Sequence, residues 1–184
     1  MDNFFKAKKK ISHFDLKNYK QIAQGKDGRI YSLTSDKCVK FFFREDTCKK
    51  EYEALKLGQK TEVIPRVYES GDNYIVMEFV KGVSLAHHMK KNGYIDKELT
   101  RKILFVLNEL KRVGFKRLDT EIRHLLLNKQ GQFKVIDHKR AFSTKTSVPI
   151  KLIKGLKKYG LEDQFLSHVQ RMQPLLYNNW KDKL

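Results

Sequence analysis

Two aspartates, Asp119 and Asp137, stand where this sequence could carry out chemistry. Asp119 precedes the apolar run Leu125–Leu127, a polar turn containing Gly131 follows, and a return strand at 133–136 leads into Asp137. We expect such a hairpin to bring both carboxylates to its open end. Paired carboxylates suit metal binding and proton acceptance during phosphoryl transfer. The alternative is that each aspartate only caps the end of a loop.

A second group of residues could bind phosphate. Gly25 and Gly28 lie between two strand-like segments, and their lack of a side chain lets the backbone approach a phosphate. In the following strand, alternation turns Cys38 and Lys40 toward one face, where a lysine needs an anionic partner. Glu51, in the next helical segment, could pair with Lys40. The simpler alternatives are a hairpin turn, a lysine on an edge strand facing water, and a solvated glutamate.

The elements that must position these residues change in character along the chain. Residues 21–80 favour strands around one helix, and residues 81–184 favour helices around one hairpin. Residues 1–20 are basic with scattered aromatic side chains, and we expect a short helix or an arm there. The patterns predict strands within 21–45 and at 67–70 and 74–80, and helices at 47–59, 84–93, 96–114, 150–159 and 162–177.

Composition and charge narrow the function classes. The chain has 184 residues, with 39 Lys and Arg against 21 Asp and Glu, a net charge of +18. Residues 129–158, the basic tract, hold nine basic residues against one acid, a surplus that attracts polyanions or only keeps a surface soluble. The sequence has no apolar run of membrane-spanning length and no secretory signal, so we expect no transmembrane segment and a cytoplasmic location. Cys38 and Cys48 fit no metal-ligand spacing and agree with a reducing compartment.

Taken in order, these motifs resemble those of the protein-kinase superfamily, over roughly residues 20–142. Residues 23–30 are similar to the glycine-rich loop, with Ala23 in the position of the first glycine. Lys40 and Glu51 match the strand lysine and the helix glutamate. Residues 75–82, Ile-Val-Met-Glu-Phe-Val-Lys-Gly, resemble the strand and hinge that hold adenine. Asp119 and Asp137 match the aspartates of the catalytic loop and of the D-F-G motif.

The sequence also departs from the superfamily pattern. Arg-Leu at 117–118 precedes the catalytic-loop aspartate in place of His-Arg, His124 stands at the metal-binding asparagine, and His-Lys at 138–139 replaces Phe-Gly. Only 47 residues follow Asp137, and no A-P-E sequence appears among them. The chain is most similar to small atypical bacterial kinases, such as the Bud/Rio and lipopolysaccharide-kinase branches.

The resemblance implies a single α+β, protein-kinase-like domain over residues 1–184. A basic segment at 1–20 would precede a compact, strand-rich N-lobe at 21–80 and a truncated helical C-lobe at 81–184. It implies ATP with Mg²⁺ or Mn²⁺ as cofactors, and an acceptor hydroxyl on a protein or small molecule. It assigns catalysis to Asp119 and Lys40, nucleotide binding to Gly25, Gly28, Lys40, Glu51, Glu78 and Val80, and metal binding to Asp137 and His124.

Three functions agree with these residues. The first is an ATP-dependent phosphotransferase of the atypical serine/threonine protein kinase type, which the pattern Lys40, Glu51, Asp119 and Asp137 favours. The second is a pseudokinase that binds nucleotide or regulates a partner without turnover, which His124 and the missing glycine after the D-F-G aspartate favour. The third is a nucleic-acid-binding module that uses the basic tract, and its affinity would fall steeply with salt.

Overall fold

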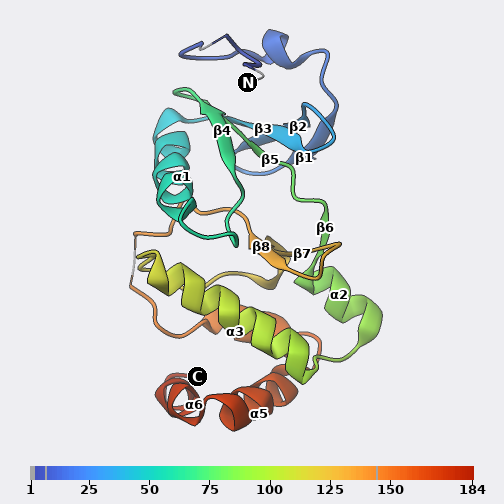
Figure 1. The fold of residues 1–184 in the computed structure, drawn as a ribbon, viewed down its shortest axis with the longest axis vertical. Coiled ribbons are helices and arrows are strands. Elements are labelled where there is room, and N and C mark those ends of the chain that lie inside the picture. The colour runs from blue at the N-terminus through green and yellow to red at the C-terminus, as the bar shows by residue number, and fades with distance from the viewer. Residues whose placement is uncertain (1–2, 7, 144) are drawn as a thin grey trace.

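A computed structural model describes residues 3–6, 8–143 and 145–184, and it has the predicted α+β, two-lobed architecture (Figure 1). The N-lobe is an antiparallel sheet of five strands in the order β1-β2-β3-β5-β4, with one helix, α1, beside it. β3 therefore lies in the middle of the sheet. The elements of the N-lobe are β1 (Gln21–Gln24), β2 (Gly28–Ser32), β3 (Lys37–Phe42), α1 (Glu45–Gly58), β4 (Val67–Ser70) and β5 (Tyr74–Glu78).

The described residues before β1 pack on the N-lobe as an arm with one short 3-10 helix, η1 (His13–Leu16). Phe5, Ile11 and Leu16 are buried in a small apolar cluster with residues of β2, β3 and β5. The side chain of Asn73 fixes the arm, because its amide accepts from the Ile11 N–H at 3.0 Å and donates to the Ile11 carbonyl at 2.8 Å. The arm thus covers the face of the sheet that points away from the C-lobe.

The C-lobe consists of helices around a three-stranded antiparallel sheet in the order β6-β7-β8. The helices predicted at 84–93 and 96–114 begin with side-chain N-caps, since Ser84 accepts from the His87 N–H and Asp96 accepts from the Leu99 N–H. The elements of the C-lobe are β6 (Gly82–Ser84), α2 (Leu85–Asn92), α3 (Lys97–Arg112), η2 (Ile122–His124), β7 (Leu125–Asn128), β8 (Phe133–Val135), α4 (Ile150–Lys157), α5 (Glu162–Met172) and α6 (Pro174–Lys181).

Two elements differ from the sequence expectation. The helix predicted at 162–177 is divided into α5 and α6, because Gln173 leaves the helical region with φ −142° and ψ 71°. The residue before a proline is disfavoured in the α conformation, and Pro174 then starts a new helix. β6 was not predicted, since three residues carry too little pattern to indicate a strand.

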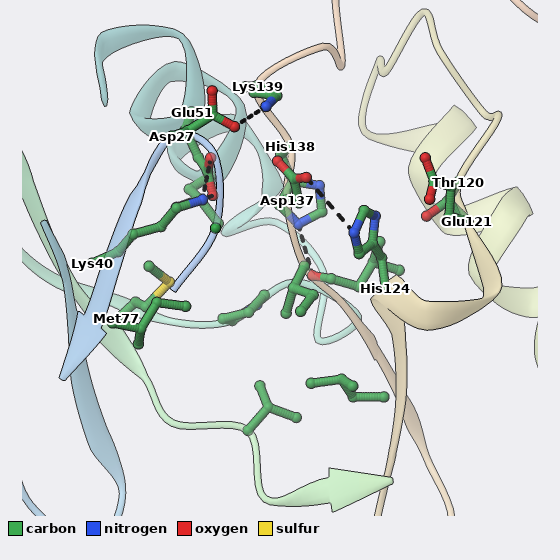
Figure 2. Close-up of a pocket in the computed structure, with 18 of the residues that line it drawn as sticks. Asp27, Lys40, Glu51, Met77, Thr120, Glu121, His124, Asp137, His138 and Lys139 are labelled. Carbon is green, nitrogen blue, oxygen red and sulfur yellow. Dashed lines mark hydrogen bonds and ion pairs between the residues drawn. The ribbon is translucent and has the colours of Figure 1, made fainter. Parts of the chain in front are cut away.

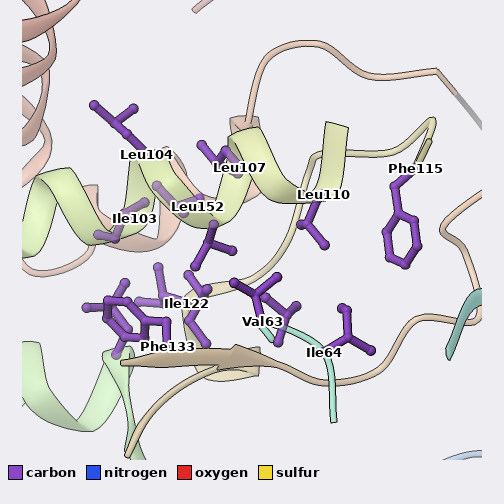
Figure 3. Packing of buried hydrophobic residues seen from close by; sticks show 14 of the residues in the cluster. Val63, Ile64, Ile103, Leu104, Leu107, Leu110, Phe115, Ile122, Phe133 and Leu152 are labelled. Atoms are coloured by element: carbon purple, nitrogen blue, oxygen red, sulfur yellow. The ribbon is translucent and has the colours of Figure 1, made fainter. Parts of the chain in front are cut away.

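The largest apolar cluster extends through both lobes (Figure 3). Its centre is the predicted apolar face of α3, including Ile103, Leu107 and Leu110. Val63 and Ile64, from the connection between α1 and β4, reach into the C-lobe and lie beside this helix. The Val135 N–H of β8 donates to the Val63 carbonyl at 2.8 Å, so a backbone hydrogen bond also joins the lobes at this point. Among the described residues, no helix is both long and apolar enough to cross a membrane.

Candidate active site

A cavity of about 730 Å³ lies between the N-lobe sheet and the C-lobe. One part of its wall is apolar, and the other carries charged side chains from both lobes. The apolar part includes Ile22, Ile30, Met77, Phe79, Leu126 and Ile136. The charged part includes Asp27, Lys40, Glu51, Asp119, His124, Asp137 and Lys139. The cavity therefore collects all nine predicted site residues, although 97 positions separate Lys40 from Asp137 in the chain.

Lys40 and Glu51 form a salt bridge on the N-lobe wall (Figure 2). The Lys40 Nζ donates to both Glu51 carboxylate oxygens, at 2.7 and 2.8 Å, and the two side chains are 13% and 3% exposed. Alternation along β3 explains the position of Lys40, because the preceding residue, Val39, is buried in the cluster under the arm. β3 pairs with strands on both sides, so the alternative of a lysine on an edge strand is wrong.

The burial of Glu51 sets its electrostatics. Desolvation raises the pKa of the Glu51 carboxyl, while the charge and hydrogen bonds of Lys40 oppose that rise. Asp137 and Lys139 also interact electrostatically with this carboxyl, so both lie within reach of the pair. Lys40, Asp137 and Lys139 therefore all act on the one buried Glu51 carboxyl.

The glycine loop, residues 24–28, joins β1 to β2 and forms the edge of the cavity. The Gly25 N–H donates to the Gly28 carbonyl at 2.9 Å and closes the turn. A Cβ at Gly28 would lie 2.0 Å from the Phe41 carbonyl oxygen, so the close pairing of β2 with β3 requires glycine there. At Gly25 a Cβ would meet no atom within 4 Å. Packing against β3 therefore requires glycine at position 28, whereas Gly25 leaves open space at the edge of the cavity.

Glu78 and Val80 occupy the hinge between the lobes and line the apolar end of the cavity. The Glu78 carboxylate is engaged elsewhere, because it accepts from the Lys134 Nζ at 2.7 Å and from the Arg66 N–H at 3.1 Å. Neither Lys134 nor Arg66 lines the cavity. The Glu78 N–H also donates to the Arg66 carbonyl at 2.7 Å, so the Glu78 carbonyl is the backbone group of this residue that could face a ligand. Among the described residues, no hydrogen bond uses the Val80 N–H, which leaves a donor available at the same place.

Asp119 lines the cavity but also supports the start of α4. One of its carboxylate oxygens accepts from the Lys151 N–H in the first turn of that helix, where Pro149 provides no side-chain cap. The other oxygen lies 3.5 Å from a guanidinium nitrogen of Arg117. The Arg117 Nε is buried without a hydrogen-bond partner among the described residues. The capping alternative thus describes one contact of Asp119, which still belongs to the cavity wall.

Asp137 follows β8 with a φ of +65°, a left-handed conformation that is costly for a residue other than glycine. Backbone strain of this kind often marks functional sites, where the surroundings maintain it. The Nε2 of His124 lies 3.7 Å from the Asp137 carboxylate (Figure 2). Burial lowers the pKa of the His124 imidazole, although the charge of Asp137 opposes this shift. A neutral imidazole and a carboxylate therefore face the same space.

The two residues after Asp137 point in different directions. His138 is only 5% exposed, its Nε2 lies 2.7 Å from the Val135 carbonyl, and its ring contacts Phe115 edge-on at 5.5 Å. Burial lowers the pKa of His138 to about 4, so the ring is neutral and the Nε2–H donates to this carbonyl. Lys139 instead forms an ion pair with Asp27 in the glycine loop. Sequence reasoning missed this pair, as no spacing signal connects residues 112 positions apart.

The donor set fits a nucleotide with a divalent metal. The apolar wall and the hinge backbone suit a flat base, and Lys40 at the other end suits phosphate. Among the described residues, no group of three or more His, Cys, Asp or Glu side chains could hold a metal ion. Mg²⁺ commonly takes one or two carboxylates and completes its shell with phosphate oxygens and water. Asp137, with His124 beside it, therefore suits a metal that arrives with a nucleotide.

Cys38 also lines this cavity, next to the hinge. Desolvation raises the pKa of its thiol to about 12, and the same cause raises the pKa of Cys48 to about 12. Both thiols are buried and free. Because the thiolate is the nucleophilic form, these cysteines serve packing and not covalent chemistry.

Comparison with known proteins identifies the family. The ABC1 atypical kinase-like domain matches residues 42–164, two thirds of the chain, which include Glu51, Asp119 and Asp137. YrzF of Bacillus subtilis (strain 168), named only provisionally as a serine/threonine-protein kinase, is 29% identical over 148 residues, 78% of this chain and 66% of YrzF. Sperm motility kinase 3A of Mus musculus is 26% identical over 134 residues, 67% of this chain and 27% of its own length. The chain spans just under two thirds of YrzF and about a quarter of the mouse kinase. The chain belongs to the ABC1 atypical kinase-like domain family.

Proposed function

We propose that this protein is an ATP-dependent phosphotransferase of the atypical serine/threonine protein kinase type. The observation that carries the proposal is the buried Lys40–Glu51 salt bridge, which opens onto the same cavity as Asp137. A buried pair is costly to desolvate, and function is a good reason to retain one that lines a cavity. Membership of the kinase-like family supports the same reaction class.

Each residue has a role in this proposal. Glu51 holds the ammonium of Lys40, which binds the α- and β-phosphates, and the glycine loop with Gly25 and Gly28 covers them. The Glu78 carbonyl and the Val80 N–H hold the base. When bound, the metal nucleotide supplies the transferable phosphoryl group and neutralises its charge. Asp137 and His124 hold the metal, Mg²⁺ or Mn²⁺, and catalysis rests on positioning and charge stabilisation.

Asp119 would accept the proton of the acceptor hydroxyl. Its contacts with the Lys151 N–H and Arg117 fix the orientation of the carboxylate. A carboxylate has about four lone-pair sites, so capping α4 leaves capacity for a substrate hydroxyl. The acceptor is a hydroxyl group on a protein or a small molecule. Residues 21–80 and 81–184 would act as the two lobes of one domain, with the basic segment 1–20 attached to the first.

The test is phosphoryl transfer from labelled ATP by the purified protein with Mg²⁺ or Mn²⁺, with autophosphorylation as the readout. Asp119→Asn is the matched variant, because the amide oxygen can still accept from the Lys151 N–H and keep α4 capped. We expect ATP binding to persist and transfer to fall by roughly 10²- to 10⁴-fold, the range for loss of a general base. Wild-type transfer by this variant would remove Asp119 from the chemistry.

A pseudokinase is the second candidate, and the C-lobe wall favours it. His124 faces Asp137, and Asp119 is engaged by α4 and Arg117. Binding of ATP without transfer in either metal would decide for this candidate.

A nucleic-acid-binding module has less support, because the basic tract is partly neutralised. Four of its nine basic residues are paired with acids: Lys134 with Glu78, Lys139 with Asp27, Lys151 with Glu121 and Lys157 with Glu162. Binding of a polyanion would fall to the remaining residues, such as Lys154 and Lys158. The tract therefore offers a smaller basic surface than its sequence suggests.

A further inference from the structure

The ion pair between Lys139 and Asp27 joins the two lobes at the mouth of the cavity (Figure 2). Lys139 comes from the C-lobe segment directly after His138, and Asp27 comes from the glycine loop of the N-lobe. Family resemblance places a glycine at position 139, so it gives no role to a side chain there. This lysine is therefore a feature of this chain that the proposed mechanism does not use.

The backbone before Lys139 is held in place. His138 is buried and bonded to the Val135 carbonyl, and Asp137 has its left-handed conformation beside it. This fixed segment directs Asp137 toward His124 and Lys139 toward the glycine loop (Figure 2). Lys139 also acts electrostatically on Glu51, the partner of Lys40. The ammonium groups of Lys40 and Lys139 thus belong to the same charged region.

If the glycine loop covers phosphates, the carboxylate of Asp27 in that loop is unfavourable for nucleotide binding. Like charges at close range repel, and a phosphate chain would compete with Asp27 for the nearest cation. The Lys139 and Asp27 side chains are 23% and 27% exposed, whereas Lys40 and Glu51 are 13% and 3% exposed. Partly solvated ion pairs are weak and exchange partners readily, while buried pairs do not. The Lys139 pair is therefore the one that an entering anion can open.

We propose that Lys139 forms a second phosphate subsite, exchanging Asp27 for the terminal phosphates of the bound nucleotide. This inference rests on the proposed function, since it takes the cavity to be a nucleotide site. Lys40 holds the inner phosphates from the N-lobe wall, and Lys139 holds the outer end from the C-lobe side. Asp27 then acts against binding, because it competes for Lys139 when the site is empty and repels phosphate when the site is filled.

Binding measurements on four variants test the proposal without requiring turnover. The dissociation constants of Mg²⁺-ATP, ADP and adenosine are measured by calorimetry for Lys139→Ala, Asp27→Asn, the double variant, and Lys10→Ala as control. Lys10 also pairs with an acid, Glu45, but lies outside the cavity. We expect Lys139→Ala to weaken ATP roughly ten- to hundredfold, as for loss of a charge-assisted contact, with adenosine unchanged. Asp27→Asn should tighten ATP binding.

The double variant distinguishes a phosphate contact from a mere neutralising charge. If Lys139 binds phosphate, Asp27→Asn increases ATP affinity partly by releasing Lys139 from its ion pair. The increase in ATP affinity should then be smaller in the Lys139→Ala background, where there is no lysine to release. If Lys139 only neutralises Asp27, the gain from Asp27→Asn is larger in the Lys139→Ala background, which would overturn the proposal. Equal ATP affinity of the wild type and Lys139→Ala would also overturn it, while leaving the proposed function intact. Absence of ATP and adenosine binding by the wild type would overturn the proposed function itself.

Discussion

The charged side chains on the two walls of the cavity find their partners in different ways. On the N-lobe wall, the charged groups Lys40 and Glu51 satisfy each other within one lobe and are almost completely buried. On the C-lobe wall, Asp119 is bonded to α4, and Lys139 finds its partner in the other lobe. The N-lobe wall follows the kinase pattern closely, whereas the C-lobe wall departs from it at several positions.

This difference indicates which wall of the cavity tolerates a change of residue type. A buried salt bridge fails if either partner is lost, because the remaining charge cannot be solvated. The C-lobe residues that replace the kinase pattern each have another structural contact, as His138 does with Phe115 and the Val135 carbonyl. His138 therefore changes the chemistry of its position without leaving its ring unsatisfied, whereas Arg117 keeps a buried Nε without a hydrogen-bond partner among the described residues.

The largest effect is expected from breaking the N-lobe pair. Lys40→Met should abolish the thermal stabilisation by Mg²⁺-ATP and any transfer activity, since the ammonium that we propose to bind phosphate is gone. It should also lower the free energy of unfolding by about 3–5 kcal/mol, because Glu51 is left buried without its partner. Urea unfolding and thermal shift with Mg²⁺-ATP measure the two effects.

The matched control for this change is the double variant Lys40→Met with Glu51→Gln. It should recover most of the lost stability, because no unpaired carboxylate remains, and it should still fail to bind ATP. Wild-type ATP affinity in the single variant would show that Lys40 is not a nucleotide contact.

The next effect tests whether His138 acts in the C-lobe wall as a neutral core side chain. Its pKa is lowered from 6.5 to about 4, so the unfolded state binds more protons than the folded state between these values. The contribution of His138 to the free energy of unfolding is fully present above pH 6.5. It decreases by about 3 kcal/mol as the pH falls from 6.5 toward 4. His138→Phe should remove this dependence. Urea unfolding of both proteins at pH 7 and pH 4.5 measures the difference, and parallel pH profiles would contradict it.

A smaller effect concerns the choice of metal by the same wall. An imidazole is a poorer ligand for Mg²⁺ than an amide oxygen and a better one for Mn²⁺. We therefore expect faster transfer with Mn²⁺ in the wild type, and His124→Asn should lower the ratio of the two rates by roughly tenfold. A ratio that does not change on substitution would place His124 outside the metal site.

The smallest effect concerns the basic tract, which lies in the C-lobe. Lys154 and Lys158 are exposed without an ion pair among the described residues, whereas Lys151 and Lys157 have acidic partners. If the tract binds a polyanion, Lys154→Ala with Lys158→Ala should reduce the salt slope of single-stranded RNA binding by about 1.4, at 0.7 per phosphate contact. The pair Lys151→Ala with Lys157→Ala should change it less. Equal and unchanged slopes would indicate a soluble surface without this function.

The parts predicted from sequence are those governed by local patterns. Alternation along β3 indicated which side chains face inward, local patterns indicated a helix at 96–114, and both hold in the structure. The order of motifs then indicated a kinase-like fold, which family membership shows. These features were accessible because each depends on a few neighbouring residues.

The parts that could not be predicted depend on contacts between distant residues. The Asp27–Lys139 pair, the bond from the Lys151 N–H to Asp119, and the contact of the Glu78 carboxylate with Lys134 all join separate elements. A single sequence gives no measure of such distances. The side-chain direction of Glu78 is a clear example, because the hinge motif indicates its position and the carboxylate then points out of the cavity.

The connection between α1 and β4 has a mechanical consequence. Val63 and Ile64 are buried in the apolar cluster of the C-lobe, and the Val63 carbonyl accepts a hydrogen bond from β8. The two lobes are therefore held together on this side of the cavity. A wide opening of the lobes about the hinge would have to break these contacts and expose the apolar side chains. Ligand entry would therefore use the opposite edge, where residues 25–27 of the glycine loop are held by the Lys139–Asp27 ion pair and by a hydrogen bond from the Phe43 N–H to the Asp27 carbonyl at 3.0 Å.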